Sequence, residues 1–202
     1  MLPDTYFIDT MGCQMNERDS ETIAGILREL GYLPADRPEE AKVVVLNTCA
    51  VREKPEHKVF SKLGSIGRLK RRHPEMLVVV AGCVAQVLGD AIQQHTPFVD
   101  IVLGPRNLSA LAEAVGQARQ TPWALTDDAE VVPEGLAFSR APGVGAFVNV
   151  SYGCNNFCSY CIVPYARGRE QSREPRAVLD EVRGAVAQGY REITLLGQNV
   201  NS

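Results

Sequence analysis

The sequence predicts an α/β protein whose first half forms a parallel sheet with helices on both of its faces. Short apolar runs rich in branched residues alternate with longer segments in which apolar residues recur at helical spacing, and this happens four times before residue 120. The runs at 43–46 and 77–80 contain only valine and leucine, without alternating polar residues. Such runs are typical of strands covered on both faces, so we expect a sheet buried between two helical layers.

The elements of this first half follow from their apolar spacing and from the residues that end them. Strands are expected at 5–9, 43–46, 77–81 and 99–103, and helices at 20–30, 52–73, 84–94 and 107–119. Gly31 provides an end for the first helix, and Pro55 lies in the first turn of the second, where proline is tolerated. The 84–94 helix has the weakest apolar pattern of the four.

Residues 121–145 differ in composition and are predicted to form a linker. They contain three prolines, three glycines and an acidic patch. We therefore expect one domain over 1–120 and the start of a second over 146–202. The second part should contain a strand at 147–150, a helix that begins at Glu174 and Pro175, and a strand at 192–196.

Three cysteines lie close together in the second part, within the sequence Gly-Cys-Asn-Asn-Phe-Cys-Ser-Tyr-Cys. Cys154, Cys158 and Cys161 are four and three positions apart, so one loop can direct three thiolates at one centre. Thiolates prefer soft metals, which makes zinc and iron–sulfur clusters the candidates. Structural zinc is almost always bound by four ligands, and no cysteine or histidine follows Cys161. The set favours an iron–sulfur cluster with one open iron position, with a zinc site that uses a distant ligand as the alternative.

The other three cysteines each follow a predicted strand of the first half. Cys13, Cys49 and Cys83 come just after the strands at 5–9, 43–46 and 77–81. Ligands of parallel sheets bind at the carboxyl ends of the strands, and neighbouring strands are about 4.8 Å apart. If these strands are adjacent, the three thiols share one rim and form a second three-thiolate site. The alternative is that each is a small buried apolar residue, as free cysteine often is.

Composition limits the class of protein. The formal net charge of −3 provides no overall electrostatic attraction to nucleic acid. We expect no membrane span, because no apolar run approaches 18 residues, and no export signal, because the N-terminus lacks a basic region followed by an apolar core. Six cysteines without an export signal favour a reducing, cytoplasmic compartment and metal or redox chemistry rather than disulfides.

The cysteine loop resembles the signature of the radical S-adenosylmethionine (SAM) enzymes, in which three cysteines hold a [4Fe–4S] cluster. Cys154, Cys158 and Cys161 match the ligands, and Tyr160 matches the aromatic position. The sequences around Cys13, Cys49 and Cys83 resemble the N-terminal domain of the methylthiotransferases, where three cysteines hold an auxiliary [4Fe–4S] cluster. The residues at 13–16 (Cys-Gln-Met-Asn) and 51–54 (Val-Arg-Glu-Lys) are similar to those of the tRNA-modifying branch of that family.

This resemblance implies two [4Fe–4S] clusters and SAM as cofactors, and tRNA as substrate. The implied reaction adds a methylthio group to C2 of N6-isopentenyladenosine at position 37, next to the anticodon. The reaction would start when the cluster on Cys154, Cys158 and Cys161 cleaves SAM, and the auxiliary cluster would supply the sulfur. A flavodoxin or ferredoxin would be the electron donor, and we expect a monomer. We also expect the chain to be an N-terminal fragment with an incomplete part-barrel, inactive alone.

Two other functions stay open at this point. One is methylthiolation of another substrate, such as a ribosomal protein. The other is a non-catalytic metal-binding RNA module, for which the basic run at 68–73 would serve, although a solvated helix face is the preferred interpretation of that run. Arg167 and Arg169 are either solvated surface residues or contacts to SAM or RNA phosphate. No side chain is assigned as a catalytic acid, base or nucleophile.

Overall fold

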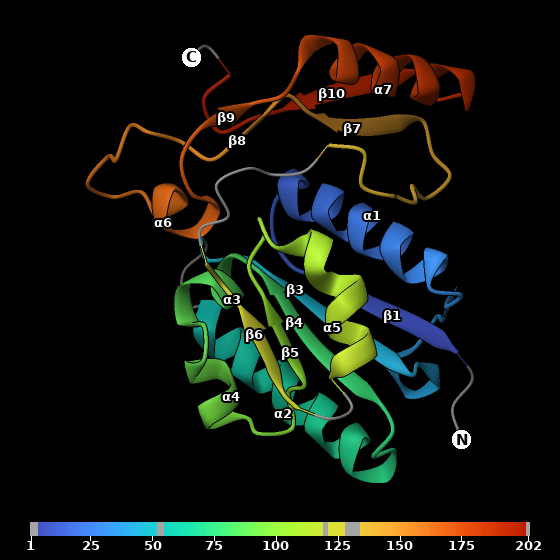
Figure 1. The fold of residues 1–202 in the computed structure, drawn as a ribbon, viewed down its shortest axis with the longest axis vertical. Helices are drawn as coiled ribbons and strands as arrows, with labels where there is room; N and C mark the ends of the chain where they lie inside the picture. Colours follow the sequence, from blue (N-terminus) through green and yellow to red (C-terminus); the bar gives the residue numbers. More distant parts are fainter. Residues whose placement is uncertain (1–3, 52–54, 119–120, 128–133, 201–202) are drawn as a thin grey trace.

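The computed structural model describes residues 4–51, 55–118, 121–127 and 134–200 (Figure 1). Its first part is a six-stranded parallel sheet with the strand order β2-β1-β3-β4-β5-β6. The strands are β1 (Thr5–Thr10), β2 (Leu33–Pro34), β3 (Val43–Thr48), β4 (Leu77–Gly82), β5 (Ile101–Leu103) and β6 (Trp123–Leu125). The predicted parallel sheet is confirmed.

Helices cover both faces of this sheet, as the valine-rich strands predicted. On one face, α1 (Gln14–Glu29) and α5 (Leu111–Gln117) pack against alternate side chains of β1, β3, β4 and β5. On the other face lie α2 (Pro55–Arg72), α3 (Cys83–Leu88) and α4 (Ala91–His95), which bury the remaining strand side chains. Two short 3-10 helices complete this part, η1 (Pro38–Glu40) and η2 (Leu108–Ala110).

Three features differ from the sequence prediction, each for a physical reason. The helix expected at 84–94 is two helices, because the chain turns at Gly89, where φ is +49°. β6 lies within the predicted linker and extends the sheet by a strand, pairing with β5. α1 begins at Gln14 rather than near residue 20, because its first turns bury polar side chains that an apolar pattern does not detect, namely Asn16, Arg18 and Asp19.

The second part is a βα unit that packs against α1. β7 (Gly145–Asn149) and β10 (Glu192–Leu196) are parallel neighbours, and α7 (Pro175–Ala187) connects them. Figure 1 shows α7 on one side of this strand pair and α1 on the other. Between β7 and α7 the chain forms β8 (Ser151–Tyr152), α6 (Val163–Arg167) and β9 (Gln171–Ser172), of which β8 and β9 pair antiparallel. Across the described residues, none of the helices is both long enough and apolar enough to span a bilayer.

Candidate metal centres at the rim of the sheet

The first set of thiols lies at the carboxyl ends of three adjacent strands. β1, β3 and β4 are neighbours, and their last residues are level in register, with Thr10 beside Asn47 and Thr48 beside Gly82. Cys13 follows β1 by three residues, whereas Cys49 and Cys83 follow β3 and β4 directly. The adjacency on which the sequence argument depended is therefore present, and the three cysteine loops share one edge of the sheet.

Two glycines let these loops approach each other closely. A Cβ at Gly12 would lie 2.8 Å from the Cβ of Cys49. A Cβ at Gly82 would lie 2.4 Å from the carbonyl oxygen of Thr48, and its φ of +91° belongs to the region that favours glycine. The cysteine loops therefore pack backbone against backbone, with no room for side chains between them.

A buried pair of amides joins the Cys13 loop to the Cys49 loop. Asn16 Nδ2 donates to Asn47 Oδ1 (3.1 Å) and to the carbonyl oxygen of Thr48 (2.8 Å), and Asn47 Nδ2 donates to the carbonyl oxygen of Asn16 (2.8 Å). The thiol of Cys13 lies 3.5 Å from Asn16 Oδ1, to which it donates. Because both amides are fully buried, their geometry fixes the spacing between the two loops.

Arg167 reaches this rim from the second part of the chain. Its guanidinium donates to Asp19 Oδ2 at 2.7 Å, and only 6% of its side chain is exposed. The interpretation of Arg167 as a solvated surface residue is therefore wrong, whereas its contact with SAM or RNA phosphate stays a prediction; Arg169, by contrast, is exposed. Burial raises the pKa of the Cys83 thiol, and the Arg167 cation acts in the opposite direction.

The second set of thiols lies on the loop between β8 and α6. Cys154 is buried, Cys161 is half-buried and Cys158 is exposed. The Cys154 amide donates to the carbonyl oxygen of Gly168 (3.1 Å), and the Cys161 amide to that of Cys158 (2.9 Å). Gly153 permits this turn, because a Cβ there would lie 2.2 Å from the carbonyl oxygen of Arg169.

Aromatic residues surround the second set. The Phe157 ring meets the Tyr165 ring edge to face at 6.0 Å, although Phe157 has an unusual φ of +45° for a non-glycine residue. Tyr160, which precedes Cys161, is 90% exposed. The loop therefore presents an aromatic surface beside its cysteines, in a conformation held by backbone contacts.

A cavity separates the first set of thiols from the second part of the chain. It measures about 320 Å³ and has Cys13 and Cys49 on one wall. The opposite wall comes from α6 and from the end of β10 with the loop that follows it. These residues are Val163, Leu195, Leu196, Gly197 and Gln198. Both parts of the chain thus line the space next to Cys13 and Cys49.

The donor chemistry of both sets fits a thiophilic metal group. All six cysteines are free thiols, and each set lies in a single cluster of loops. Within the described ranges, the thiol, imidazole and carboxylate groups do not converge in threes at metal-binding distance. The structure therefore supplies soft ligands on shared loops rather than a preassembled cage, and binding would require the thiols to turn toward one centre.

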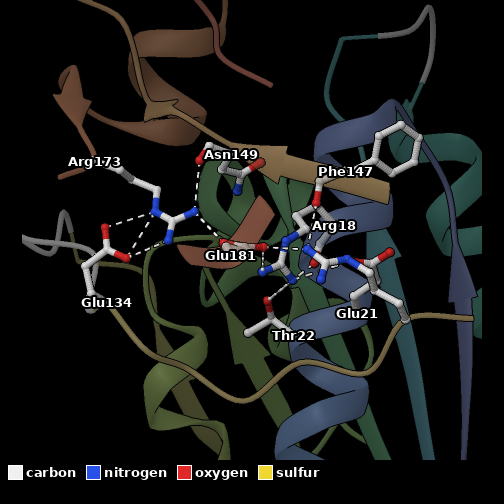
Figure 2. Close-up of polar contacts among 9 residues, drawn as sticks. Arg18, Glu21, Thr22, Glu134, Phe147, Asn149, Arg173 and Glu181 are labelled. Atoms are coloured by element: carbon white, nitrogen blue, oxygen red, sulfur yellow. Dashed lines mark hydrogen bonds and ion pairs between the residues drawn. The ribbon is translucent and has the colours of Figure 1, made fainter. Parts of the chain in front are cut away.

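An ionic cluster holds the two parts together (Figure 2). Glu181 of α7 accepts from Arg18 of α1 (2.9 Å), from Arg140 (2.5 Å) and from Arg173 (2.6 Å). Arg140 also donates to the carbonyl oxygen of Phe147 (3.0 Å) on β7. Burial alone would raise the pKa of Glu181, but the three arginines outweigh it and lower that pKa. Sequence reasoning missed this cluster, because Arg18, Arg140 and Arg173 lie 163, 41 and 8 positions from Glu181 and carry no motif.

Arg18 and Arg140 also pack against one aromatic ring and line a large cavity. The guanidinium carbons of Arg18 and Arg140 lie 4.4 and 4.3 Å from the ring centre of Phe138, on the segment that joins the two parts. The cavity beside them measures about 510 Å³ and has walls from α1, α7 and that segment. Residues 134–140 of the joining segment therefore lie against both parts of the chain.

Glu21 gives this cluster a pH dependence. Burial raises its pKa from 4.5 to about 7, against the influence of Arg18 and Arg140, whose nitrogens lie 3.5 Å from its carboxylate. Because the folded state holds this proton more tightly than the unfolded chain, the Glu21 contribution favours folding at low pH and is lost as pH rises from about 4.5 to about 7. Thermal melts of wild type and Glu21→Gln from pH 5 to 8 test this. The melting temperature of the wild type should fall relative to that of Glu21→Gln as pH rises to about 7, and the difference should be constant above it.

Comparisons with known proteins agree with the two-part architecture. The family described as "Uncharacterized protein family UPF0004" matches residues 5–104, and the Radical SAM superfamily matches residues 148–202. A protein of Moorella thermoacetica named tRNA-2-methylthio-N(6)-dimethylallyladenosine synthase is 51% identical over 98% of this chain and 46% of its own length. A protein of the same name from Clostridium novyi is 47% identical over 98% of this chain and 45% of its own length.

The chain spans about half the length of the curated relatives it matches. Among solved structures, the radical SAM methyltransferase TsrM from Kitasatospora setae, with tryptophan and a SAM analogue bound, matches with a TM-score of 0.61 and 16% identity. That match covers 98% of this chain and 48% of TsrM. At this identity it concerns the fold alone, and it covers both parts of the chain.

Proposed function

The chain belongs to the methylthiotransferase family of radical SAM proteins, and on this premise we propose that the full-length protein is a tRNA methylthiotransferase. Its reaction would attach a methylthio group to C2 of N6-dimethylallyladenosine at position 37 of tRNA. The observation that carries the proposal is the 45–51% identity to tRNA-2-methylthio-N(6)-dimethylallyladenosine synthases over 98% or more of this chain. The relatives do not favour a ribosomal-protein substrate or a non-catalytic RNA module.

The two cysteine sets have distinct roles in this proposal. Cys154, Cys158 and Cys161 would hold a [4Fe–4S] cluster with one iron free for SAM, and Cys13, Cys49 and Cys83 would hold a second, auxiliary cluster. When bound, these groups supply an electron for SAM cleavage and sulfur for the product, chemistry that no side chain can perform. Residues 1–120 would form the auxiliary-cluster domain, 121–145 the linker, from which β6 joins the sheet of the first part, and 146–202 the start of the radical SAM domain.

The protein's own contribution would be to bring the two thiol sets toward one interface between the two parts of the chain. Arg167 lies at the end of α6, which follows the second set directly, and it contacts Asp19 beside the first set. The β10 loop and Val163 line the cavity next to Cys13 and Cys49.

The proposed partners follow from the substrate. A base beside the anticodon lies in a single-stranded loop, where it can be splayed out and stacked on aromatic side chains, unlike a base in an A-form helix. The protein would act as a cytoplasmic monomer, with a flavodoxin or ferredoxin as its electron donor. The exposed ring of Tyr160 lies next to Cys161, on the loop where SAM would bind.

Iron analysis of cysteine variants tests the assignment. The full-length protein, reconstituted anaerobically, should bind about eight irons per chain, as two four-iron clusters require. Cys13→Ala should lose about half of this iron and keep SAM cleavage. Cys154→Ala should lose the other half together with SAM cleavage. One or two zinc ions per chain, or loss of SAM cleavage in Cys13→Ala, would contradict the proposal.

A further inference from the structure

One buried cation lies where the second part of the chain meets the loops of Cys13 and Cys83. α6 ends at Arg167 and packs against α3, which begins at Cys83. Besides its ion pair with Asp19, the Arg167 guanidinium donates to Asn16 Oδ1 at 3.4 Å, the same oxygen that accepts from the Cys13 thiol. Arg167 is therefore a residue of the second part whose side chain contacts residues beside the first thiol set.

The electrostatic effect of Arg167 reaches two of the three thiols. Its charge and a hydrogen bond act on the Cys83 thiol, and the guanidinium also interacts electrostatically with Cys13. Because this interface is buried, the interaction between these charges is screened less than it would be at the surface. Asp19 is the opposing charge, since it pairs with Arg167 at 2.7 Å.

Arg106 fixes the backbone that carries Arg167. From the turn after β5, Arg106 Nη1 donates to the carbonyl oxygens of Arg169 (2.9 Å) and Arg167 (3.4 Å). Arg106 is itself buried. The end of α6 is thus held by the first part of the chain both at the backbone and at the Arg167 side chain, and the docking of the two parts places the cation at the rim.

We propose that Arg167 is a positioning residue that raises the reduction potential of the iron–sulfur centre on Cys13, Cys49 and Cys83, an inference that rests on the proposed function. One-electron reduction adds a negative charge to such a centre without forming or breaking a bond, so a nearby buried cation stabilises the reduced form. Because α6 carries the cation, this potential depends on the docking of the second part against the first.

Redox titration of charge variants tests this inference. The full-length protein is reconstituted in a Cys154→Ala background, which leaves the first centre alone, and is titrated with dithionite while the reduced form is followed by EPR. Arg167→Met should lower the equilibrium constant for reduction about tenfold, which is a potential lower by ~59 mV for a one-electron couple. Asp19→Asn should shift the potential in the opposite direction. Arg169→Met, which changes an exposed charge two residues away, should leave it unchanged.

The opposite signs of the two shifts separate an electrostatic role from a structural one. Arg167→Lys keeps the charge and should stay close to the parent potential. A shift of the same direction in Arg167→Met and Asp19→Asn, or no shift in either, would overturn the inference. If Arg167→Met retains no iron, the direction of the potential shift in Asp19→Asn alone tests the inference. Absence of any cluster in the Cys154→Ala parent would instead contradict the proposed function.

Discussion

Glu181→Ala is expected to destabilise the protein by about 3–5 kcal/mol, because it removes the shared partner of three buried arginines. The side chain of Glu181 is 7% exposed, and that of Arg140 is 2% exposed. Without the carboxylate, three buried positive charges lose the acceptor that they share, and Glu21 and Glu134 are the carboxylates that remain beside them. The free energy of unfolding, measured by circular dichroism in urea, should fall accordingly, and proteases should cleave the segment between the two parts more readily.

The adjacent residue of α7 provides a matched control. Asp180 pairs with Arg183 at 2.8 Å, but its side chain is 61% exposed and that of Arg183 is 72% exposed. An exposed ion pair of this kind contributes less than about 1 kcal/mol, so Asp180→Ala should barely change the free energy of unfolding. Equal losses in the two variants would mean that burial of the Glu181 cluster does not determine its contribution.

The parallel sheet and the placement of the first thiol set were predictable from local sequence. Consecutive branched residues in β3 and β4 indicated strands buried on both faces, and a cysteine follows each of β1, β3 and β4 at the same topological place. The order of strands was not derivable from these patterns. Hydrogen bonding between β1, β3 and β4 settles it, and it brings the Cys13, Cys49 and Cys83 loops to one edge.

The contacts between the two parts could not be predicted, because they join residues far apart in sequence. The first turns of α1 contain Asn16, Arg18 and Asp19, which look like exposed polar residues until their partners are known. Arg18 pairs with Glu181 and Asp19 with Arg167 across the two parts, and Asn16 bonds Asn47 within the first part, at separations of 31 to 163 positions. Helical apolar spacing detects only the later turns of α1, so the predicted start of this helix was too late.

Gly82→Ala is expected to cost about 3 kcal/mol or more, because a methyl group there meets backbone that cannot move. The new Cβ would lie 2.4 Å from the Thr48 carbonyl oxygen and 2.5 Å from Asn47 Oδ1. The left-handed φ of +91° adds about 1–3 kcal/mol of strain, and overlap in a packed region adds a similar amount. Urea unfolding gives the loss directly. Iron binding by the first thiol set should fall as well, since Gly82 is the last residue of β4 and directly precedes Cys83.

Two other glycines separate the causes of this loss. Gly31 also has a positive φ, of +87°, but nothing lies within 4 Å of its Cβ position, so Gly31→Ala measures backbone strain alone and should cost about 1 kcal/mol. Gly64 lies in α2 with open space around it, and Gly64→Ala should stabilise by about 0.5–1 kcal/mol through helix propensity. If Gly82→Ala lowers the free energy of unfolding no more than Gly31→Ala does, the cysteine loops separate easily. Loops that move apart for one methyl group would not hold the thiols of Cys13, Cys49 and Cys83 at a fixed spacing.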